Sequence, residues 1–406
     1  MKADIPTQIC IVGGGPAGLV AGMLFARAGV ETLVLEKHAD FLRDFRGDTV
    51  HPSTMELFDQ LGLLDELLQL PHNKVDRIRA RVAGRFIEIA DFKRLKTPAP
   101  FIAMMPQWDL LDFIADKAKR YPTFRLMLSS EATGIVAGEG GRIAGVTLAD
   151  GRTIGASLVI AADGRRSILR REAALPLEEL GAPMDVFWFR VPKHREEETF
   201  GVFENGRIIV LIDRGDYWQC AFVFPKGEGE RVRSRPIEAF RQELSTAVPL
   251  LAEGIGEIAS WDDVKLLSVG LDRLTRWYKP GLLAIGDAAH AMSPIGGVGI
   301  NLAVQDAVAA ANILASPMAK GEAPDPLLAK VQARRWKPTA RIQGLQKIAQ
   351  DNIIAPLVSG KSGLTRPPLP LRLFNRLPFL RWIPARVIGL GFARERIESP
   401  DAFGTG

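Results

Sequence analysis

Residues Thr7 to Glu36 read TQICIVGGGPAGLVAGMLFARAGVETLVLE, and this stretch decides the fold. It begins with an apolar run, Gln8 to Val12, which is short enough for a buried strand. A glycine-rich turn follows, then apolar residues at helical spacing, and then a second apolar run, Thr32 to Leu35. The order strand, turn, helix, strand predicts a βαβ unit of a parallel sheet.

The glycines of this turn fit the pattern G-x-G-x-x-G at Gly13, Gly15 and Gly18. Such glycines permit a tight turn, the close approach of a pyrophosphate, and close packing of the helix on the strand. Glu36 follows 36 − 13 = 23 residues after Gly13, the spacing at which an acid reaches a ribose 2′-hydroxyl. The stretch therefore predicts a dinucleotide site without a 2′-phosphate. The predicted site also includes Pro16, Ala17 and Lys37.

A second glycine-rich stretch, Gly281 to Ala307, reads GLLAIGDAAHAMSPIGGVGINLAVQDA. Leu282 to Ile285 form a strand pattern, and Asp287 follows it, where open α/β sheets bind their ligands. Glycines before the next helical pattern let the backbone approach a ligand and aim N–H groups at anionic oxygen. A carboxylate accepts hydrogen bonds from hydroxyls instead. The stretch therefore favours a ligand with a polyol and a site of developing negative charge, and a flavin has both.

A third stretch, SLVIAADGRRSILRR, runs from Ser157 to Arg171. Ser157 to Ala161 again form a buried-strand pattern, which ends in Asp163 and Gly164 with arginines close behind. An acid at a strand end with nearby arginines offers acceptors for hydroxyls and donors for phosphate together.

The segment GDAAHAMSPIGGVGIN, Gly286 to Asn301, resembles the second flavin motif of the FAD-dependent aromatic hydroxylases. These are single-component monooxygenases typified by para-hydroxybenzoate hydroxylase. The other two stretches resemble the family's dinucleotide and D-G motifs and occur in the family's order. The resemblance covers most of the chain and implies FAD as cofactor and NADH or NADPH as co-substrate. It implies that reduced flavin takes up O2 as a C4a-hydroperoxide, which hydroxylates a phenolic or N-heteroaromatic small molecule.

The resemblance also implies which residues contact the cofactor. Arg46 lies in the loop before a helix that starts near Pro52, and Gln107 precedes another helix; a solvated loop arginine is the other interpretation of Arg46. His51 either faces the flavin or only bonds locally. The remaining implied contacts are Asp163, Gly286, Asp287, Pro294, Gly297, Gly299, Ile300 and Asn301. No catalytic base is predicted.

The fold that the resemblance implies is α/β: a Rossmann-like FAD-binding domain, βαβ plus parallel sheet, with an inserted mixed β-sheet substrate domain and a helical C-terminal tail. The FAD-binding domain is predicted over residues 1–73, 98–180 and 269–320. The substrate domain is predicted over residues 74–97, a hairpin around Gly84, and over 181–268. The tail is predicted over residues 321–406.

The substrate domain shows strand patterns in DVFWFRVP, RIIVLIDRG and YWQCAFVFPKG. Alternation places Trp188 and Arg190 on the face opposite Phe187 and Phe189. By the same alternation, Tyr217 and Gln219 lie opposite Trp218 and Cys220. The sequence leaves open which face covers the active site. The substrate candidates are Trp188, Arg190, Tyr217, Gln219 and Pro294, and sheet core or solvent face is the alternative for the four strand residues.

Composition excludes several other classes. With 406 residues, 47% hydrophobic and 24% charged, the chain suits a soluble globular protein of two or three domains. Its net charge of +5 is spread without a basic block, which argues against nucleic-acid binding. Two cysteines, Cys10 and Cys220, form no disulfide framework, so a reducing cytoplasm fits. No metal-ligand cluster and no uninterrupted membrane span are predicted.

The C-terminal stretch RPPLPLRLFNRLPFLRWIPARVIGLGF interleaves arginines with apolar residues. Such a pattern is compatible with a segment that lies on a membrane, with one that buries a lipid-like substrate, and with a cover packed on the flavin domain. The prolines favour the cover, because they break the long amphipathic helix that suits a membrane role. The alternative function is an FAD-dependent reductase or desaturase of a lipid-like or prenyl substrate. A third hypothesis is a flavin-binding protein without turnover. The sequence does not indicate whether NADH or NADPH is used. It also leaves the assembly open, with a homodimer as one option.

Overall fold

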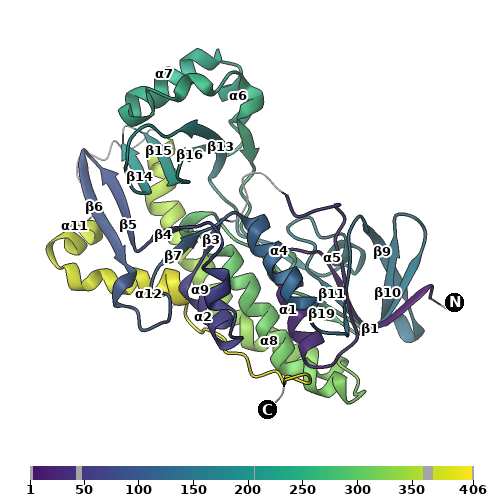
Figure 1. Cartoon of the computed structure of the whole chain (residues 1–406). Helices are drawn as coiled ribbons and strands as arrows, with labels where there is room; N and C mark the ends of the chain where they lie inside the picture. Colours follow the sequence, from purple (N-terminus) through teal and green to yellow (C-terminus); the bar gives the residue numbers. More distant parts are fainter. Residues whose placement is uncertain (1–2, 43–47, 205, 360–368, 405–406) are drawn as a thin grey trace.

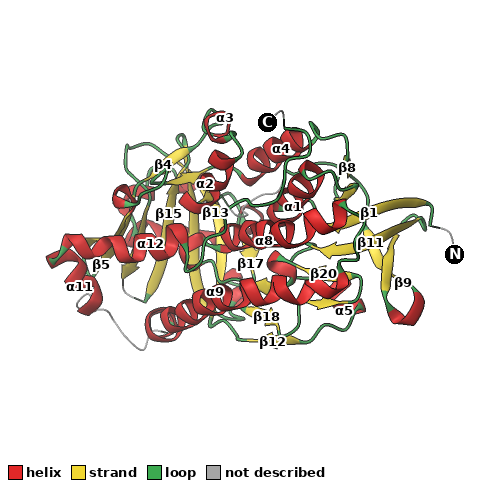
Figure 2. Cartoon of the chain, turned by 90° about the horizontal axis from the view of Figure 1, so that it is seen from below, coloured by secondary structure: helices red, strands yellow, loops and turns green. Residues whose placement is uncertain are grey.

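The computed structural model describes residues 3–42, 48–204, 206–359 and 369–404. Two large β-sheets dominate this part of the chain, with long helices packed between and beside them (Figures 1 and 2). The fold is mixed α/β, as predicted from the sequence.

The first large sheet contains the predicted βαβ unit. β1 (Ile5–Val12) pairs in parallel with β2 (Thr32–Leu35) on one side and with β11 (Thr153–Ala161) on the other. α1 (Pro16–Arg27) crosses over between β1 and β2. In β1, Ile9, Cys10 and Ile11 are fully buried, because a parallel sheet is covered on both faces. The other strands are β8 (Phe124–Met127), β9 (Ala132–Ala137), β10 (Ile143–Leu148), β19 (Tyr278–Lys279) and β20 (Leu282–Ala284).

Long helices cover this sheet. α1 packs between the sheet, α4 (Gln107–Ala118) and α8 (Gly299–Ala319), and α9 (Leu328–Ala349) packs on α8 (Figure 1). A Cβ on Gly22 would lie 2.6 Å from the Val34 side chain, so glycine lets α1 approach β2 closely. Within the described residues, Ile295–Ala319 alone has the length and hydropathy of a membrane span. Its most apolar window is 83% buried, as in the central helix of a globular core.

The second large sheet has the order β17-β13-β16-β15-β14-β5-β6. Its strands are β5 (Arg77–Val82), β6 (Arg85–Asp91), β13 (Met184–Pro192), β14 (Phe200–Glu204), β15 (Arg207–Asp213), β16 (Tyr217–Pro225) and β17 (Lys265–Leu267). The predicted hairpin around Gly84 thus joins strands found more than 100 residues later. β14 escaped prediction because its short apolar run follows a charged loop. The predicted domain boundaries stay a prediction.

One face of the second sheet packs on α6 (Gly229–Arg233) and α7 (Ile237–Ala247), which lie over it in Figure 1. The remaining helices are α2 (Pro52–Gln60), α3 (Leu64–Leu67), α5 (Ile168–Glu172), α10 (Ala355–Val358), α11 (Leu369–Arg376) and α12 (Trp382–Leu390). Two small sheets complete the fold: β3 (Thr49–Val50) with β7 (Ile102–Met104) and β4 (Asn73–Val75), and β12 (Leu177–Glu179) with β18 (Asp272–Leu274) and β21 (His290–Ala291).

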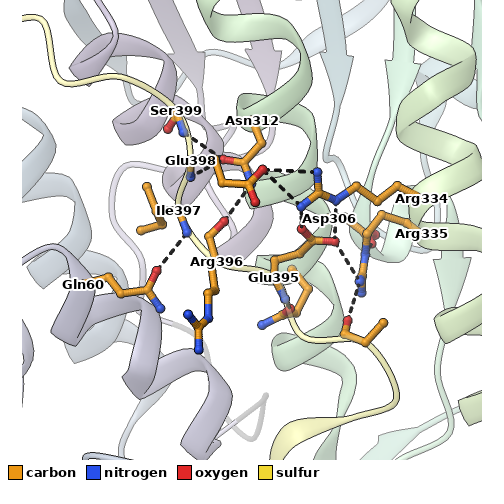
Figure 3. Close-up of polar contacts among 12 residues, drawn as sticks. Gln60, Asp306, Asn312, Arg334, Arg335, Glu395, Arg396, Ile397, Glu398 and Ser399 are labelled. Carbon is orange, nitrogen blue, oxygen red and sulfur yellow. Dashed lines mark hydrogen bonds and ion pairs between the residues drawn. The ribbon is translucent and has the colours of Figure 1, made fainter.

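Residues 391–404, after α12, run back over the helices of the first large sheet without forming a helix. The backbone N–H of Ile397 donates to Gln60 of α2 at 2.9 Å, and that of Glu398 donates to Asn312 of α8 at 2.8 Å (Figure 3). Further on, the N–H of Ala402 donates to the carbonyl of Arg27 at 2.9 Å. The C-terminal stretch therefore ties α2, α8 and α1 together.

A buried carboxylate, Asp306 of α8, joins three separate segments. Its Oδ2 accepts the N–H of Gly286 at 3.1 Å and Nε2–H of His290 at 2.6 Å, and its Oδ1 accepts Nε–H of Arg335 at 2.9 Å. Burial alone would raise the pKa of Asp306, but His290 and Arg335 hold it below its usual value. The carboxylate therefore stays charged and fully paired in the core.

This network continues to the C-terminal stretch. Arg335 of α9 donates to the carbonyl of Ala393 at 3.1 Å and pairs with Glu395 at 3.4 Å (Figure 3). Arg334 pairs with Glu395 at 2.6 Å and with the exposed Glu398 at 3.5 Å. Charge is thus compensated all the way from the Gly286 turn to the surface.

Loss of the buried end of this network, Asp306, should lower the free energy of unfolding far more than loss of its exposed end, Glu398. We expect Asp306→Ala to lower the free energy of unfolding by about 3–5 kcal/mol, because Arg335 and His290 lose their buried partner. Glu398→Ala, at the exposed end, should cost below about 1 kcal/mol. Urea unfolding of the two variants measures both values, and similar losses in the two would contradict the buried hub.

Candidate active site

Four of the predicted cofactor residues lie at one edge of the first sheet, where its parallel strands end. The N–H of Gly13 donates to Leu35 and that of Ala162 donates to Val12, both at 2.8 Å. The N–H of Ile285 donates to Ala161 at 3.0 Å. Residues that follow four strand ends are therefore neighbours in space. They are Gly13 after β1, Glu36 after β2, Asp163 after β11 and Asp287 after β20.

Two of the three motif glycines are required by the backbone, and the third faces open space. A Cβ on Gly13 would lie 2.3 Å from the carbonyl oxygen of Ala162, and Gly13 has φ +110°. A Cβ on Gly18 would lie 1.9 Å from the carbonyl oxygen of Gly13. A Cβ on Gly15 would meet nothing within 4 Å, although Gly15 lies at the N-terminus of α1. Space in front of an uncapped helix N-terminus suits a pyrophosphate.

Glu36 lies beside this turn, at the end of β2. Its carboxylate accepts the N–H of Gly14 and the N–H of His38, each at 3.0 Å. Lys37 is exposed next to it. The acid is thus held against the glycine turn, where the adenosine end of a dinucleotide would bind.

Asp163 caps the N-terminus of α5. Its Oδ2 accepts the N–H groups of Ile168 at 2.8 Å and Leu169 at 3.4 Å, whereas its Oδ1 is buried without a partner among the described residues. Burial raises the pKa of Asp163, against the hydrogen bonds it accepts from Ser167 and Leu169. One oxygen is therefore left to accept a hydrogen bond from a ligand.

Asp287 lies at the same edge of the sheet, three residues after Ala284, the last residue of β20. It forms a half-exposed ion pair with Arg165 at 3.2 Å. Gly286, before it, has φ +59° and approaches Ala17 and Ala303, so this turn is wedged between α1 and α8.

The loop before α8 is fixed by residues from the segment 49–54. Thr49 Oγ1 donates to the carbonyl of Gly297 at 2.8 Å, and His51 Nε2 lies 3.0 Å from the same oxygen. Asn301 Oδ1 accepts the hydroxyls of Ser53 at 2.5 Å and Thr54 at 2.9 Å. The Oδ1 atom of Asn301 is therefore engaged within the protein, and the backbone at this position is held in place.

The start of α8 offers several backbone N–H groups to a ligand. Leu302 donates the first hydrogen bond of the helix, to Val298 at 3.1 Å. The N–H groups of Gly299, Ile300 and Asn301 lie before it and have no intrahelical acceptor. Together with the positive end of the helix dipole they form an anion site. Pro294, half-buried, begins the loop that leads to it.

The sequence also predicted cofactor contacts at Arg46 and Gln107. Arg46 lies outside the described residues. Gln107 is the first residue of α4, and its N–H donates to the carboxylate of Asp48.

Asp48 belongs to a buried cluster that sequence reasoning missed. Its carboxylate pairs with Arg214, from the turn between β15 and β16, and Arg214 Nε donates to Gln219 Oε1 at 2.9 Å. Burial raises the pKa of Asp48, against the opposing effect of Arg214. Asp48 precedes β3 and Arg214 follows β15, so only tertiary contact brings these residues together, and no local sequence signal could have indicated them.

The faces of the second sheet alternate as predicted, and the structure distinguishes them. Phe187 and Phe189 are buried against Phe240 of α7, so their face is core. Trp188, on the other face, shares an apolar cluster with Ile295 of the loop before α8. That face therefore lies over the predicted flavin loop.

The other substrate candidates divide between the interior and the edge of the sheet. Gln219 is buried in the Asp48 cluster. Arg190 is exposed, lies directly opposite Gln219 in the β13–β16 pair, and stacks over the ring of Tyr217 at 5.1 Å from its centroid. The substrate roles stay predictions.

Comparison with known proteins agrees with this geometry. The family model "FAD binding domain" matches residues 6–343. The chain is 31% identical to 6-methylpretetramide 4-monooxygenase of Streptomyces rimosus, over 94% of this chain and 92% of that protein. It is 27% identical to the aklavinone 12-hydroxylase DnrF of Streptomyces peucetius, over 82% of this chain and 72% of the relative.

Among solved structures, PqsL of Pseudomonas aeruginosa in complex with 2-aminobenzoylacetate superposes with a TM-score of 0.75. The two are 21% identical, and the match covers 87% of this chain and 100% of that one, so it supports the fold. The chain belongs to the FAD-binding family of the aromatic hydroxylases, which are flavoprotein monooxygenases.

The residues present fit FAD. The open space at Gly15, the unpartnered oxygen of Asp163 and the free N–H groups at the start of α8 lie along one edge of the sheet. The helix N-terminus at Gly15 offers N–H donors for a pyrophosphate. Asp163 offers an acceptor for hydroxyls, and the start of α8 offers N–H donors for a flavin carbonyl.

The glycine turn generates a paired prediction. Gly18→Ala should lower the stability of the flavin-free protein by about 1–3 kcal/mol, because its methyl group collides with the Gly13 carbonyl. Gly15→Ala should leave that stability within about 0.5 kcal/mol and weaken FAD binding at least about tenfold. Thermal unfolding and FAD titration measure the two effects. Wild-type FAD affinity in Gly15→Ala would show that the pyrophosphate does not cross Gly15.

His51 generates a pH prediction. Burial lowers the pKa of His51 from 6.5 to about 4, so the folded protein keeps it neutral while the unfolded chain protonates it. Its contribution to stability is therefore lost as pH falls from 6.5 towards 4, by about 3 kcal/mol at the lower end.

The control is His51→Gln, which keeps an N–H for the Gly297 carbonyl and does not titrate. The stability difference between wild type and this variant, from urea unfolding at several pH values, should shift against the wild type below pH 6.5. A difference that stays constant with pH would contradict the buried neutral histidine.

Proposed function

We propose that this chain is an FAD-dependent monooxygenase that uses NADH or NADPH and O2 to hydroxylate a phenolic or N-heteroaromatic small molecule. The observation that carries the proposal is the position of the second sheet. Its Trp188 face packs with Ile295, so an apolar surface covers the loop that leads to the anion site of α8. A flavin ring bound at that helix would lie beneath an apolar cover.

Bound FAD would supply the electron transfer and the oxygen activation. The chain would supply binding and electrostatics. The N–H groups of Gly299, Ile300 and Asn301 would stabilise negative charge at the N1/C2=O edge of the ring. Gly15 would leave room for the pyrophosphate, Glu36 would bind the adenosine ribose, and Asp287 would accept hydroxyls of the ribitol.

The apolar cover would exclude water from the reaction. Trp188, Val210 and Ile212 of the sheet cluster with Met104 of β7, and Trp188 also contacts the Ile295 cluster. A water-poor site protects a reactive oxygen species from side reactions. A small aromatic ring is the kind of substrate that such a surface binds.

The Asp48 cluster would orient that ring. Gln219 lies on the same face of the sheet as Trp188, because Trp188 pairs with Ala221 two residues further along β16. Arg214 is only 5% exposed, and its Nη1 has no hydrogen-bond partner among the described residues. This N–H is available for an anionic or phenolic oxygen of the substrate.

The compartment and the assembly are also proposals. Cys10 and Cys220 are both free and buried, which is compatible with a reducing cytoplasm. That the protein forms a homodimer is also a proposal, because the structure contains a single chain.

The test is product analysis with labelled oxygen. FAD-loaded protein is mixed with NADH or NADPH, a panel of phenols and N-heteroaromatics, and oxygen-18 gas. We expect at least one aromatic compound to accelerate oxidation of the nicotinamide and to gain one labelled oxygen atom, as measured by mass spectrometry.

Two variants serve as controls. Asp287→Ala should lose flavin and activity together, because a ribitol contact is lost. Asp325→Ala removes a comparable half-exposed ion pair, with Arg142, and should keep both. Reduction of an added alkene without labelled oxygen would replace the proposal by the reductase alternative. Bound flavin with no response to any aromatic compound would favour a binding protein without turnover.

A further inference from the structure

The C-terminal helices expose a repeated pattern of apolar residues and arginine. α11 carries Leu369, Arg372, Leu373 and Arg376, at positions i, i+3, i+4 and i+7. The same spacing recurs ten residues later in Phe379, Trp382, Ile383 and Arg386, across the turn that begins α12. Residues at this spacing share one face of a helix.

The apolar members of the pattern are in solvent. Their exposed fractions are 74% for Leu369, 44% for Leu373, 53% for Phe379, 42% for Trp382 and 44% for Ile383. No other stretch of the described chain places so many large exposed apolar side chains so close together in sequence. Single exposed apolar residues are normal, but a contiguous group marks an interaction surface.

The opposite sides of both helices are anchored on β6. Leu371 packs with the cluster of Ala80, Val82 and Ile87, whereas Ala385 packs with the cluster around Phe92. An ion pair between Arg381 and Glu88 adds a polar tie. The exposed faces therefore lie away from β6, and in Figures 1 and 2 α11 lies at the end of the molecule opposite the N-terminus.

The arginines of this surface are available to a partner. Arg372, Arg376 and Arg386 are exposed, and none forms an ion pair with another described residue. Each follows an exposed apolar residue by one helical turn. Such arginines can lay their aliphatic stems along apolar surface and keep their charges at its boundary.

We propose that this surface, residues Leu369, Arg372, Leu373, Arg376, Phe379, Trp382, Ile383 and Arg386, docks on an anionic lipid membrane. Apolar side chains enter the boundary between headgroups and acyl chains, tryptophan prefers that depth, and arginines bind lipid phosphates. Pro378 separates α11, of eight residues, from α12, of nine, so each helix lies on the membrane and is too short to cross it. This proposal is independent of the reaction.

Charge favours lipid over a second copy of the chain. A two-fold interface would bring the same patch of each copy together, and with it the arginines of both, which form no ion pair within the described part of the chain. The overall charge of +5 adds to that repulsion. An anionic surface is attracted by the same residues.

The test is cosedimentation of the full-length, flavin-loaded protein with vesicles. We expect binding to vesicles of equal phosphatidylglycerol and phosphatidylcholine, weakened by salt, and little binding to phosphatidylcholine alone. The triple variant Arg372→Gln/Arg376→Gln/Arg386→Gln should bind the anionic vesicles about 100-fold more weakly. The variant Leu373→Ser/Trp382→Ser should also lose at least about tenfold.

Matched variants separate the patch from general properties of the protein. Arg120→Gln/Arg152→Gln/Arg171→Gln removes the same charge at exposed sites elsewhere. Leu345→Ser/Ile348→Ser removes exposed apolar residues from α9. Both should bind like the wild type, and flavin absorbance confirms that every variant is folded.

Three results would overturn the proposal. Equal losses in the patch and control arginine variants would assign binding to net charge alone. Absence of binding to anionic vesicles would exclude a lipid partner. Patch-dependent dimerisation in size-exclusion chromatography, without vesicle binding, would assign the surface to a second copy.

Discussion

The close approach of four strand ends at one sheet edge is the constraint on which the rest of the structure depends. The turn after β1 crosses so near to the residue after β11 that a single methyl group on Gly13 would lie 2.3 Å from the Ala162 carbonyl. That approach is possible only with glycine, and it places Glu36, Asp163 and Asp287 around one turn. The polar groups of the edge are therefore assembled by backbone packing before any ligand binds.

A second layer of interactions holds this edge from behind. Asp306 bonds to Gly286 at the turn and to Arg335 in α9, and Arg335 in turn holds the C-terminal stretch. Thr49 and His51 hold the carbonyl of Gly297, while Ser53 and Thr54 hold Asn301. The loop before α8 is thereby fixed from the side of α2, which is what an ordered ring-binding site requires.

Local sequence predicted those parts of the structure whose cause is local. The βαβ unit, the helix start at Pro52 and the hairpin around Gly84 follow from periodicity, glycine and proline, and each is present. Alternation separated Trp188 from Phe187 correctly, but only the packing of α7 on one face showed which side is core. Asp306 and the Asp48–Arg214 pair escaped prediction because their partners are distant in sequence. A lone acid inside the apolar run of α8 was a signal that could have indicated Asp306. The predicted roles of the cofactor and substrate residues stay predictions.

We propose that this sheet edge binds one FAD in an extended form, with the flavin ring at the start of α8. The most direct measurement is an experimental structure of the protein after addition of FAD. We expect density for the pyrophosphate over Gly15 and for the pyrimidine edge of the ring within hydrogen-bond distance of the N–H groups of Gly299 to Asn301. Density for FAD elsewhere on the chain, or none at saturating FAD, would contradict it.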